Sequence, residues 1–174
     1  MRLFTPSWRQ GHTVAPSQMG VDLPETISKL DGPLVKQFSV FLPNKVGAML
    51  DIVKLLNGHH INVVAISVSE STDSAIARIV VSDPEGTQDL FRKNNIAFGL
   101  SEVVVVEMRE VATQLVKLLA SLFMAEVNVH FTYSLLTRPR GMAALAVHVD
   151  DTDCASSVLL GAGFKILSQN DISR

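Results

Sequence analysis

The spacing of apolar side chains changes several times after residue 34, and each change predicts a new element. Alternating apolar and polar residues over 35–42 predict a half-buried strand, whereas the apolar positions within 47–57 fall on one face of a helix. Asp83 and Pro84 are typical of a helix N-cap and a first helical residue. The first half is therefore predicted to form strands over 35–42, 61–68, 75–81 and 96–100, and helices over 47–57 and from Pro84 onward.

The second half has the same order of elements. Four consecutive valines, Val103–Val106, predict a strand that is buried on both faces. Residues 127–135 alternate, with Phe131 and Tyr133 on the apolar side and His130 on the polar side. The predicted elements are strands over 102–108, 127–135, 142–149 and 164–167, and helices over 111–124 and 152–161.

The two halves also align residue by residue. Residues 46–63 match residues 112–129 at an offset of 66, and residues 84–98 match residues 152–166 at an offset of 68. A repeat of about 70 residues has the size of a small domain. The order βαββαβ in each copy predicts an α+β fold made of two ferredoxin-like domains, with antiparallel sheets and helices on one face. The predicted division is an N-terminal extension over 1–33 and domains over 34–101 and 102–174.

The extension differs from the rest of the chain in composition. Residues 1–33 hold four of the seven prolines and show neither a strand nor a helix period. A short helix over 24–30 is expected, and Phe4 and Trp8 are candidates for anchoring the segment to the body. A mobile tail is the alternative interpretation.

Composition excludes several classes of partner. A net charge of −2 and a pI of about 6.2 provide no electrostatic basis for binding nucleic acid or an anionic membrane. No apolar run approaches the ~20 residues of a membrane span. The single cysteine, Cys154, and the lack of an apolar leader favour a cytoplasmic location. With 47% hydrophobic residues, either the core is large or some apolar surface packs against a partner.

No constellation for catalysis is evident in the sequence. A nucleophile–base set, a phosphate-binding loop and a dinucleotide fingerprint are all missing, so we expect no enzyme activity and no cofactor. His130 and His148 are predicted to be neighbours on adjacent strands, but a zinc site needs three or four ligands and no third is evident. We therefore predict no metal site.

Several segments, in order, resemble the ACT domain, a small regulatory module that binds amino acids. The first half carries PNKVG after the first strand, HINV before the second and IVVSDPEGTQDLF after the third, and the second half carries VNVHFTYSLL and AGFKILSQNDI. These phrases are most similar to stand-alone tandem ACT proteins of the acetolactate synthase-like group. The resemblance covers about residues 35–172. It implies that ACT domains pair side by side into an eight-stranded sheet and bind an amino acid at the interface, near the loop from strand one to helix one.

The resemblance implies a ligand site in the first copy. Gly47 allows close approach of the backbone, and the helix that follows it presents free N–H groups to a carboxylate. Asn44 and Asn62 match two asparagines that bind serine from opposite subunits in serine-binding ACT domains, but the histidine of that pattern falls on Leu42. The alternative is that these residues only form a turn and a loop cap. The candidate ligand-binding residues are Asn44, Lys45, Val46, Gly47, Ala48 and Asn62.

The second copy departs further from the pattern. In the alignment Thr113 stands where the first copy has Gly47, and Glu110 replaces an asparagine with a charge that repels a carboxylate. Asn128 is retained, and Tyr133 matches a tyrosine common in the tandem group, with core packing as its alternative role. We predict that the first loop binds ligand better than the second, which instead forms a dimerisation surface.

These expectations combine into a non-catalytic, homodimeric regulatory protein that senses a small amino acid. Branched-chain amino acids are favoured because Val46, Ala48 and Val63 near the site are aliphatic. One alternative is a regulatory subunit of an amino-acid biosynthetic enzyme such as acetolactate synthase. The other is a dimerisation module without a ligand.

Overall fold

The computed structural model describes residues 32–43, 45–70 and 74–173. The predicted helix over 24–30 and the predicted anchors Phe4 and Trp8 lie outside these residues. The elements are β1 (Val35–Pro43), α1 (Ala48–Gly58), β2 (Val63–Glu70), β3 (Ser74–Val81), α2 (Pro84–Lys93), β4 (Phe98–Met108), α3 (Val111–Met124), β5 (Val129–Ser134), η1 (Pro139–Gly141), β6 (Ala143–Val149), α4 (Thr152–Gly161), β7 (Ile166–Leu167) and α5 (Gln169–Ile172). None of the described helices combines the length and apolar composition that crossing a membrane requires.

The strands form one seven-stranded antiparallel sheet with the order β2-β3-β1-β4-β6-β5, and β7 also pairs with β4. Strand β4 is shared by both halves of the chain: Phe98–Val103 pair with β1, and Val104–Met108 pair with β6. Each half therefore has the strand order of a ferredoxin-like domain, and the predicted fold class is confirmed.

The shared strand differs from the two strands predicted over 96–100 and 102–108. Only Ser101 separates the two predicted strands, and it is neither a glycine nor a proline that would interrupt an extended backbone. The chain therefore continues straight from the edge of the first half into the centre of the second. The two halves of one chain are joined by backbone hydrogen bonds to the same strand.

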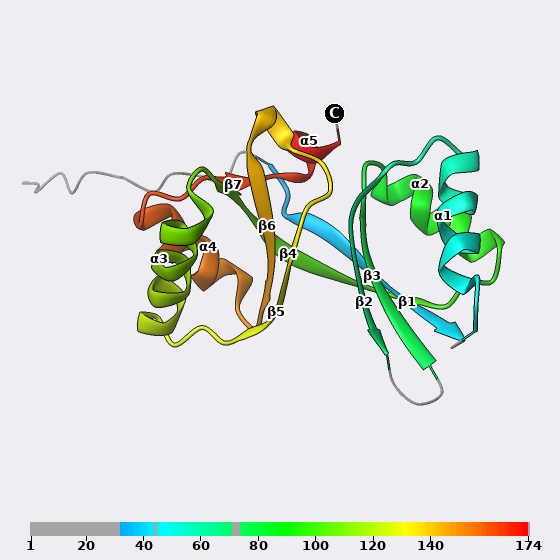
Figure 1. The fold of residues 1–174 in the computed structure, drawn as a ribbon, viewed down its shortest axis with the longest axis horizontal. Helices are drawn as coiled ribbons and strands as arrows, with labels where there is room; N and C mark the ends of the chain where they lie inside the picture. The colour runs from blue at the N-terminus through cyan, green and yellow to red at the C-terminus, as the bar shows by residue number, and fades with distance from the viewer. Residues whose placement is uncertain (1–31, 44, 71–73, 174) are drawn as a thin grey trace, which may run out of the picture.

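The four long helices cover the outer face of each half of the sheet, and the short helix α5 lies at the edge of the inner side. Figure 1 shows α1 and α2 against one half and α3 and α4 against the other, with the helix-free faces turned toward each other. Each helix layer encloses its own apolar cluster. A third cluster lies between the helix-free faces, and we call it the inter-sheet core. It consists of Val35, Val64, Ala65, Val80, Val103, Val105, Tyr133, Leu135, Ala144, Ala146, Leu167 and Ile172.

The four valines of β4 take part in two of these clusters. Val103 and Val105 lie in the inter-sheet core, whereas Val104 and Val106 pack in the helix-covered cluster of the second half. All four side chains are completely buried. The predicted burial of this strand on both faces is confirmed, and β4 is the element on which both halves depend.

Strand β5 departs from the predicted uninterrupted alternation. The register of its pairing with β6 shifts between Val129 and Phe131. Such a bulge changes the face to which the following side chains point. Val129 therefore packs in the helix-covered cluster, whereas Phe131 and Tyr133 face the inter-sheet core.

The last helix fastens the second half to the first. Gln169 is buried at the start of α5, which the sequence patterns did not predict. Its side-chain oxygen accepts from the backbone N–H of Lys36 (3.1 Å), and its amide donates to the carbonyl of Val81 (3.0 Å). Its backbone N–H donates to the carbonyl of Pro33 (3.0 Å). Both β1 and β3 of the first half are thus held by one side chain from the end of the second.

Aspartates cap the second helix of each half, and Asp83 is the N-cap that the sequence predicted. Asp83 and Asp151 cap α2 and α4, each accepting a backbone N–H from the first turn of its helix. The sequence predicts a left-handed residue at Asn57 or Gly58, but Gly58 still belongs to α1 and His60 takes the positive φ of 59°. Histidine tolerates this conformation better than a β-branched residue does.

Candidate functional site

The bend between β1 and α1 has the backbone geometry that the sequence predicted. Gly47 is the N-cap of α1 with φ 90° and ψ −13°, a left-handed conformation that favours glycine. Among the described residues no side chain caps this helix start, and a Cβ atom added at Gly47 would have no neighbour within 4 Å. The N–H of Ala48 donates to the carbonyl of Lys45 (3.3 Å), and the next N–H groups of the first turn have no partner in the described part of the chain, at the positive end of the helix dipole.

Exposed side chains surround this bend. Lys45 and Val46 are exposed, and Leu50 in the first turn of α1 is 54% exposed. Ala48 instead packs inside the first half, so it can contribute backbone but little side-chain surface. Asn44 lies outside the described residues.

Asn62 lies at the opposite end of the same half-sheet. Strands β1 and β2 both run antiparallel to β3, so they are parallel to each other. Gly47 follows the end of β1, whereas Asn62 precedes the start of β2, and α1 between them spans about 16 Å (Figure 1). A ligand that touches both residues must therefore contact two copies of the chain.

The bend before α3 is filled by its own side chains. Gln114 accepts from the backbone N–H groups of Arg109 (2.6 Å) and Glu110 (3.2 Å) through Oε1. The hydroxyl of Thr113 donates to the Glu110 carboxylate (3.2 Å). Sequence reasoning missed Gln114, although a glutamine one turn after a helix start is a known capping signal. Gln114 thus occupies the two N–H groups that precede the first turn of α3, and the Glu110 carboxylate lies at the same helix start.

The repeat alignment placed Thr113 over Gly47, and the structure corrects this correspondence. Glu110 is the N-cap of α3, so Thr113 lies within the first turn of the helix. Helix α3 has 14 residues and α1 has 11, while their last residues stay at the offset of 66. The three extra residues are therefore at the start of α3.

The other end of each half does preserve the repeat. The backbone N–H of Asn62 donates to the hydroxyl of Ser82 (3.0 Å), and that of Asn128 donates to the carboxylate of Asp150 (3.0 Å). In each pair the asparagine carbonyl accepts the partner's backbone N–H. Both asparagine side chains are exposed. The backbone of each asparagine caps its loop, as in the alternative interpretation above. The side-chain amide takes no part in these hydrogen bonds, so it is available to a ligand.

Tyr133 has the core-packing role. It is 8% exposed within the inter-sheet core, and its hydroxyl donates to Oε1 of Gln37, 2.6 Å away on β1. Burial raises the pKa of Tyr133 well above its usual value, and nearby Arg78 opposes that shift. Tyr133 therefore links the two helix-free faces and does not point to the second bend.

We expect Tyr133→Phe to lower the free energy of unfolding by about 1–3 kcal/mol, because Oε1 of the buried Gln37 loses its donor. Urea unfolding followed by circular dichroism measures this. The double variant Gln37→Leu/Tyr133→Phe should cost less than the sum of the single variants, since neither partner is then left alone. A loss for Tyr133→Phe below about 0.5 kcal/mol would show that this hydrogen bond is not structural.

His130 and His148 are neighbours as predicted, with ring centroids 5.3 Å apart. Within the described part of the chain, no group of three or more histidine, cysteine, aspartate or glutamate side chains is placed to hold a metal ion. Cys154 is partly buried near the start of α4. His59 and His60 are exposed in the loop after α1, as expected.

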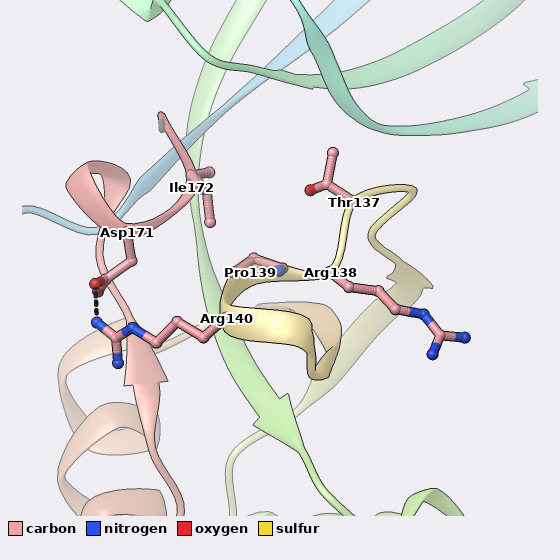
Figure 2. Close-up of a pocket in the computed structure, with 6 residues that line it drawn as sticks. All are labelled: Thr137, Arg138, Pro139, Arg140, Asp171 and Ile172. Carbon is pink, nitrogen blue, oxygen red and sulfur yellow. Dashed lines mark hydrogen bonds and ion pairs between the residues drawn. The ribbon is translucent and has the colours of Figure 1, made fainter.

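A cavity of about 190 Å³ lies between the η1 turn and α5, lined by Arg138, Arg140 and Asp171 among others (Figure 2). Arg138 and Arg140 are both exposed, and Arg140 forms an ion pair with Asp171. Burial alone would raise the pKa of Asp171, but hydrogen bonds from Ser168 and the Arg140 guanidinium hold it below the usual value. Figure 2 shows Arg138 pointing away from this pair. The charges of Arg140 and Asp171 neutralise each other. The ion pair therefore has a structural role, and the cavity beside it is a weak candidate for a ligand site.

The chain matches the family model of the ACT domain pair over residues 34–174, which include both ferredoxin-like halves and the Gly47 bend. The chain belongs to the ACT domain pair family. ACT domains are regulatory modules. Among curated proteins, none matches the chain.

Solved structures similar to this ACT pair share its fold over most of the chain. Protein BT0572 from Bacteroides thetaiotaomicron is 27% identical with a TM-score of 0.74, covering 81% of this chain and 96% of that one. The ligand-free regulatory subunit of aspartate kinase from Thermus thermophilus is 11% identical with a TM-score of 0.54, covering 77% and 95%. The corresponding subunit from Thermus flavus is 12% identical with a TM-score of 0.51, covering 78% and 95%. The two kinase subunits show similarity of fold alone.

Proposed function

We propose that this ACT pair is a non-catalytic amino-acid sensor. The ligand binds where the Gly47 bend of one copy meets Asn62 of a second copy, in a cytoplasmic homodimer. The observation that carries this proposal is the start of α1, which no described side chain caps and where a left-handed glycine lies beside open space. The second bend serves less well, because the Glu110 carboxylate repels an anion and the side chains of Thr113 and Gln114 bond back to the bend itself.

The chemistry of the bend suits a zwitterion. The α-carboxylate accepts hydrogen bonds from the first turn of α1, where the helix dipole also favours a negative charge. The ammonium group needs acceptors, which the side-chain oxygen of Asn62 from the other copy supplies. Val46 and Leu50 offer exposed apolar surface for an aliphatic side chain. A branched-chain amino acid is therefore the preferred ligand.

A regulatory subunit of an amino-acid biosynthetic enzyme, such as acetolactate synthase, is the second candidate function. It is favoured by apolar side chains that α3 leaves exposed, with Val116 at 71% and Phe123 at 80%. Exposed apolar faces of this kind mark contacts with other proteins. The fold that the chain shares with regulatory subunits of aspartate kinase is in keeping with this role. If α3 instead contacts only a second copy and no ligand binds, the chain is a dimerisation module.

A screen of the amino acids by thermal shift tests the sensor proposal. A ligand at about 100 times its Kd is expected to raise the Tm by on the order of 5–10 °C. The ligand acts by raising the population of the conformation or assembly that binds it. Calorimetric titration of each hit then gives the number of ligands bound per chain.

Gly47→Val is expected to abolish this binding, because valine resists the left-handed backbone and fills the open space. Gly58→Val, at the other end of α1 with equally open surroundings, is the matched control and should bind normally. Thr113→Gly should also leave the affinity unchanged. Sensitivity to changes in the second bend alone would contradict the proposal, and silence to all amino acids would favour the subunit or dimerisation role.

A further inference from the structure

A second cavity, of about 330 Å³, lies beside the inter-sheet core between the helix-free faces of the two halves. We call it the wedge cavity. Gln37, Ser39, Arg78 and Ser101 line it from the first half, and Phe131 and His148 line it from the second. Its volume is in the range of small-molecule sites. No sequence pattern pointed to it, because its residues come from five strands of both halves.

The wedge cavity has positive charge without a described counter-ion. The Arg78 guanidinium carbon lies 4.2 Å from the centroid of the Phe131 ring, and the His148 imidazole stacks on the same side chain at 4.5 Å. His130 adds a second imidazole beside His148. Among the side chains of residues 32–43, 45–69 and 74–173, no acidic group pairs with Arg78, and none lines this cavity.

His148 has a polar atom that the protein leaves unused. Its Nδ1 atom is buried and has no hydrogen-bond partner among the described residues. Burial, His130 and Arg78 together lower the pKa of His148, in that order of importance. A bound anion would offset the repulsion from His130 and Arg78 and accept a hydrogen bond from the imidazole. Buried polar atoms are almost always paired; Nδ1 is closed to solvent in this structure, so it reaches a ligand in the cavity only when the imidazole rotates.

Donors outnumber acceptors around the wedge cavity. Oε1 of Gln37 already accepts from Tyr133, and its Nε2 donates to the hydroxyl of Ser101 (3.1 Å). Arg78 is a charged donor and the His148 imidazole supplies one N–H in its neutral form, whereas no described carboxylate is present for an ammonium group. Phe41 and Leu100 contribute apolar surface and are 53% and 44% exposed. The site therefore suits a monocarboxylate whose other polar atoms only accept hydrogen bonds, with an apolar tail.

We propose that the wedge cavity binds a small α-keto acid with an aliphatic side chain. The carboxylate pairs with Arg78, the keto oxygen accepts from His148 or a serine hydroxyl, and the tail lies against Phe41 and Leu100. This site is separate from the Gly47 bend, which suits the ammonium-bearing amino acid. Because both halves supply ligand contacts, occupancy would hold the two halves together.

Calorimetric titration of the full chain tests the proposal with three probes: α-ketoisocaproate, leucine and inorganic phosphate. Leucine has the same carbon skeleton with an ammonium group in place of the keto oxygen. We expect α-ketoisocaproate to bind, and Arg78→Gln to weaken its binding at least about tenfold through loss of the charged hydrogen bonds. Arg92→Gln, an exposed arginine on α2, is the matched control and should bind like the wild type.

The pH dependence provides a second readout that a purely structural role for Arg78 would not produce. The charged or titratable groups facing His148 are Arg78 from β3 and His130 from β5, whereas the lining residues of β1 and β4 are neutral. Binding of an anion raises the pKa of His148, so binding takes up a proton and the affinity should fall as the pH rises through the histidine range. Histidine NMR signals should report this shift, and His148→Gln should remove the pH dependence.

Three results would overturn the proposal. One is no saturable binding of α-ketoisocaproate to the wild type. Another is equal binding of phosphate or leucine that Arg78→Gln abolishes, because the site would then not select the keto acid. The third is loss of α-ketoisocaproate binding in Gly47→Val with retention in Arg78→Gln. Leucine binding that is lost in Gly47→Val but kept in Arg78→Gln takes place at the Gly47 bend. The two variants therefore distinguish a failure of the sensor proposal from a failure of the wedge-cavity proposal.

Discussion

Val105→Asp is expected to unfold both halves of the chain in a single transition. Val105 is completely buried in the inter-sheet core, on the strand that belongs to both half-sheets. A carboxylate there has no partner, and burying it costs at least about 4 kcal/mol, a large part of the stability of a typical domain. Urea unfolding followed by circular dichroism, together with amide hydrogen exchange on both halves, measures the effect.

Val68→Asp is the matched control. Val68 lies on the edge strand β2 and is 49% exposed, so the same chemical change should cost less than about 1 kcal/mol. Exchange protection that survives in one half of Val105→Asp would contradict the single transition. It would show that the halves fold independently despite the shared strand.

The order of elements could be predicted from the sequence because each element carries a local signal. The alternation over 35–42, the helical spacing over 47–57 and the Asp-Pro helix start depend on neighbours a few residues away. The joining of the two halves could not be predicted in this way. Residues 96–108 contain two apolar segments, and only their pairing with β1 and β6 shows that they form one strand.

Some features of the candidate site could likewise be predicted from local sequence, and others could not. The left-handed Gly47 and the helix start after it follow from local sequence, and the structure has both. The filling of the second bend by Gln114 depends on a side chain one turn into α3, beyond the aligned loop. The wedge cavity depends on a bulge in β5 that turns Phe131 toward the first half, and no local pattern announces a bulge.

These differences show how a duplicated domain can take on unequal roles. The two copies keep the same capping aspartates and the same asparagine loop. They differ where one bend is open and the other is closed by its own side chains. If the open bend is the ligand site that we propose, a tandem pair has fewer ligand sites than domains, and the second half is available for contacts with a second copy.

Mixing Gly47→Val chains with Asn62→Ala chains is expected to restore amino-acid binding that neither variant shows alone. The two residues lie at opposite ends of one half-sheet, so the proposed site takes Gly47 from one copy and Asn62 from the other. In a two-fold dimer each mixed pair then contains one intact site and one doubly altered site. Random mixing of equal amounts makes half of the dimers mixed, so about a quarter of all sites should bind at wild-type affinity.

Calorimetric titration of the refolded mixture measures this fraction as a stoichiometry. Asn62→Ala should leave the fold intact, because the hydrogen bonds of Asn62 with Ser82 use its backbone and its side chain is exposed. The control mixture pairs Gly47→Val with the double variant Gly47→Val/Asn62→Ala, in which every site contains valine at the bend and none should bind. If a single copy supplied both residues, the first mixture would bind no better than its components, and the ligand could not lie at the junction of two chains.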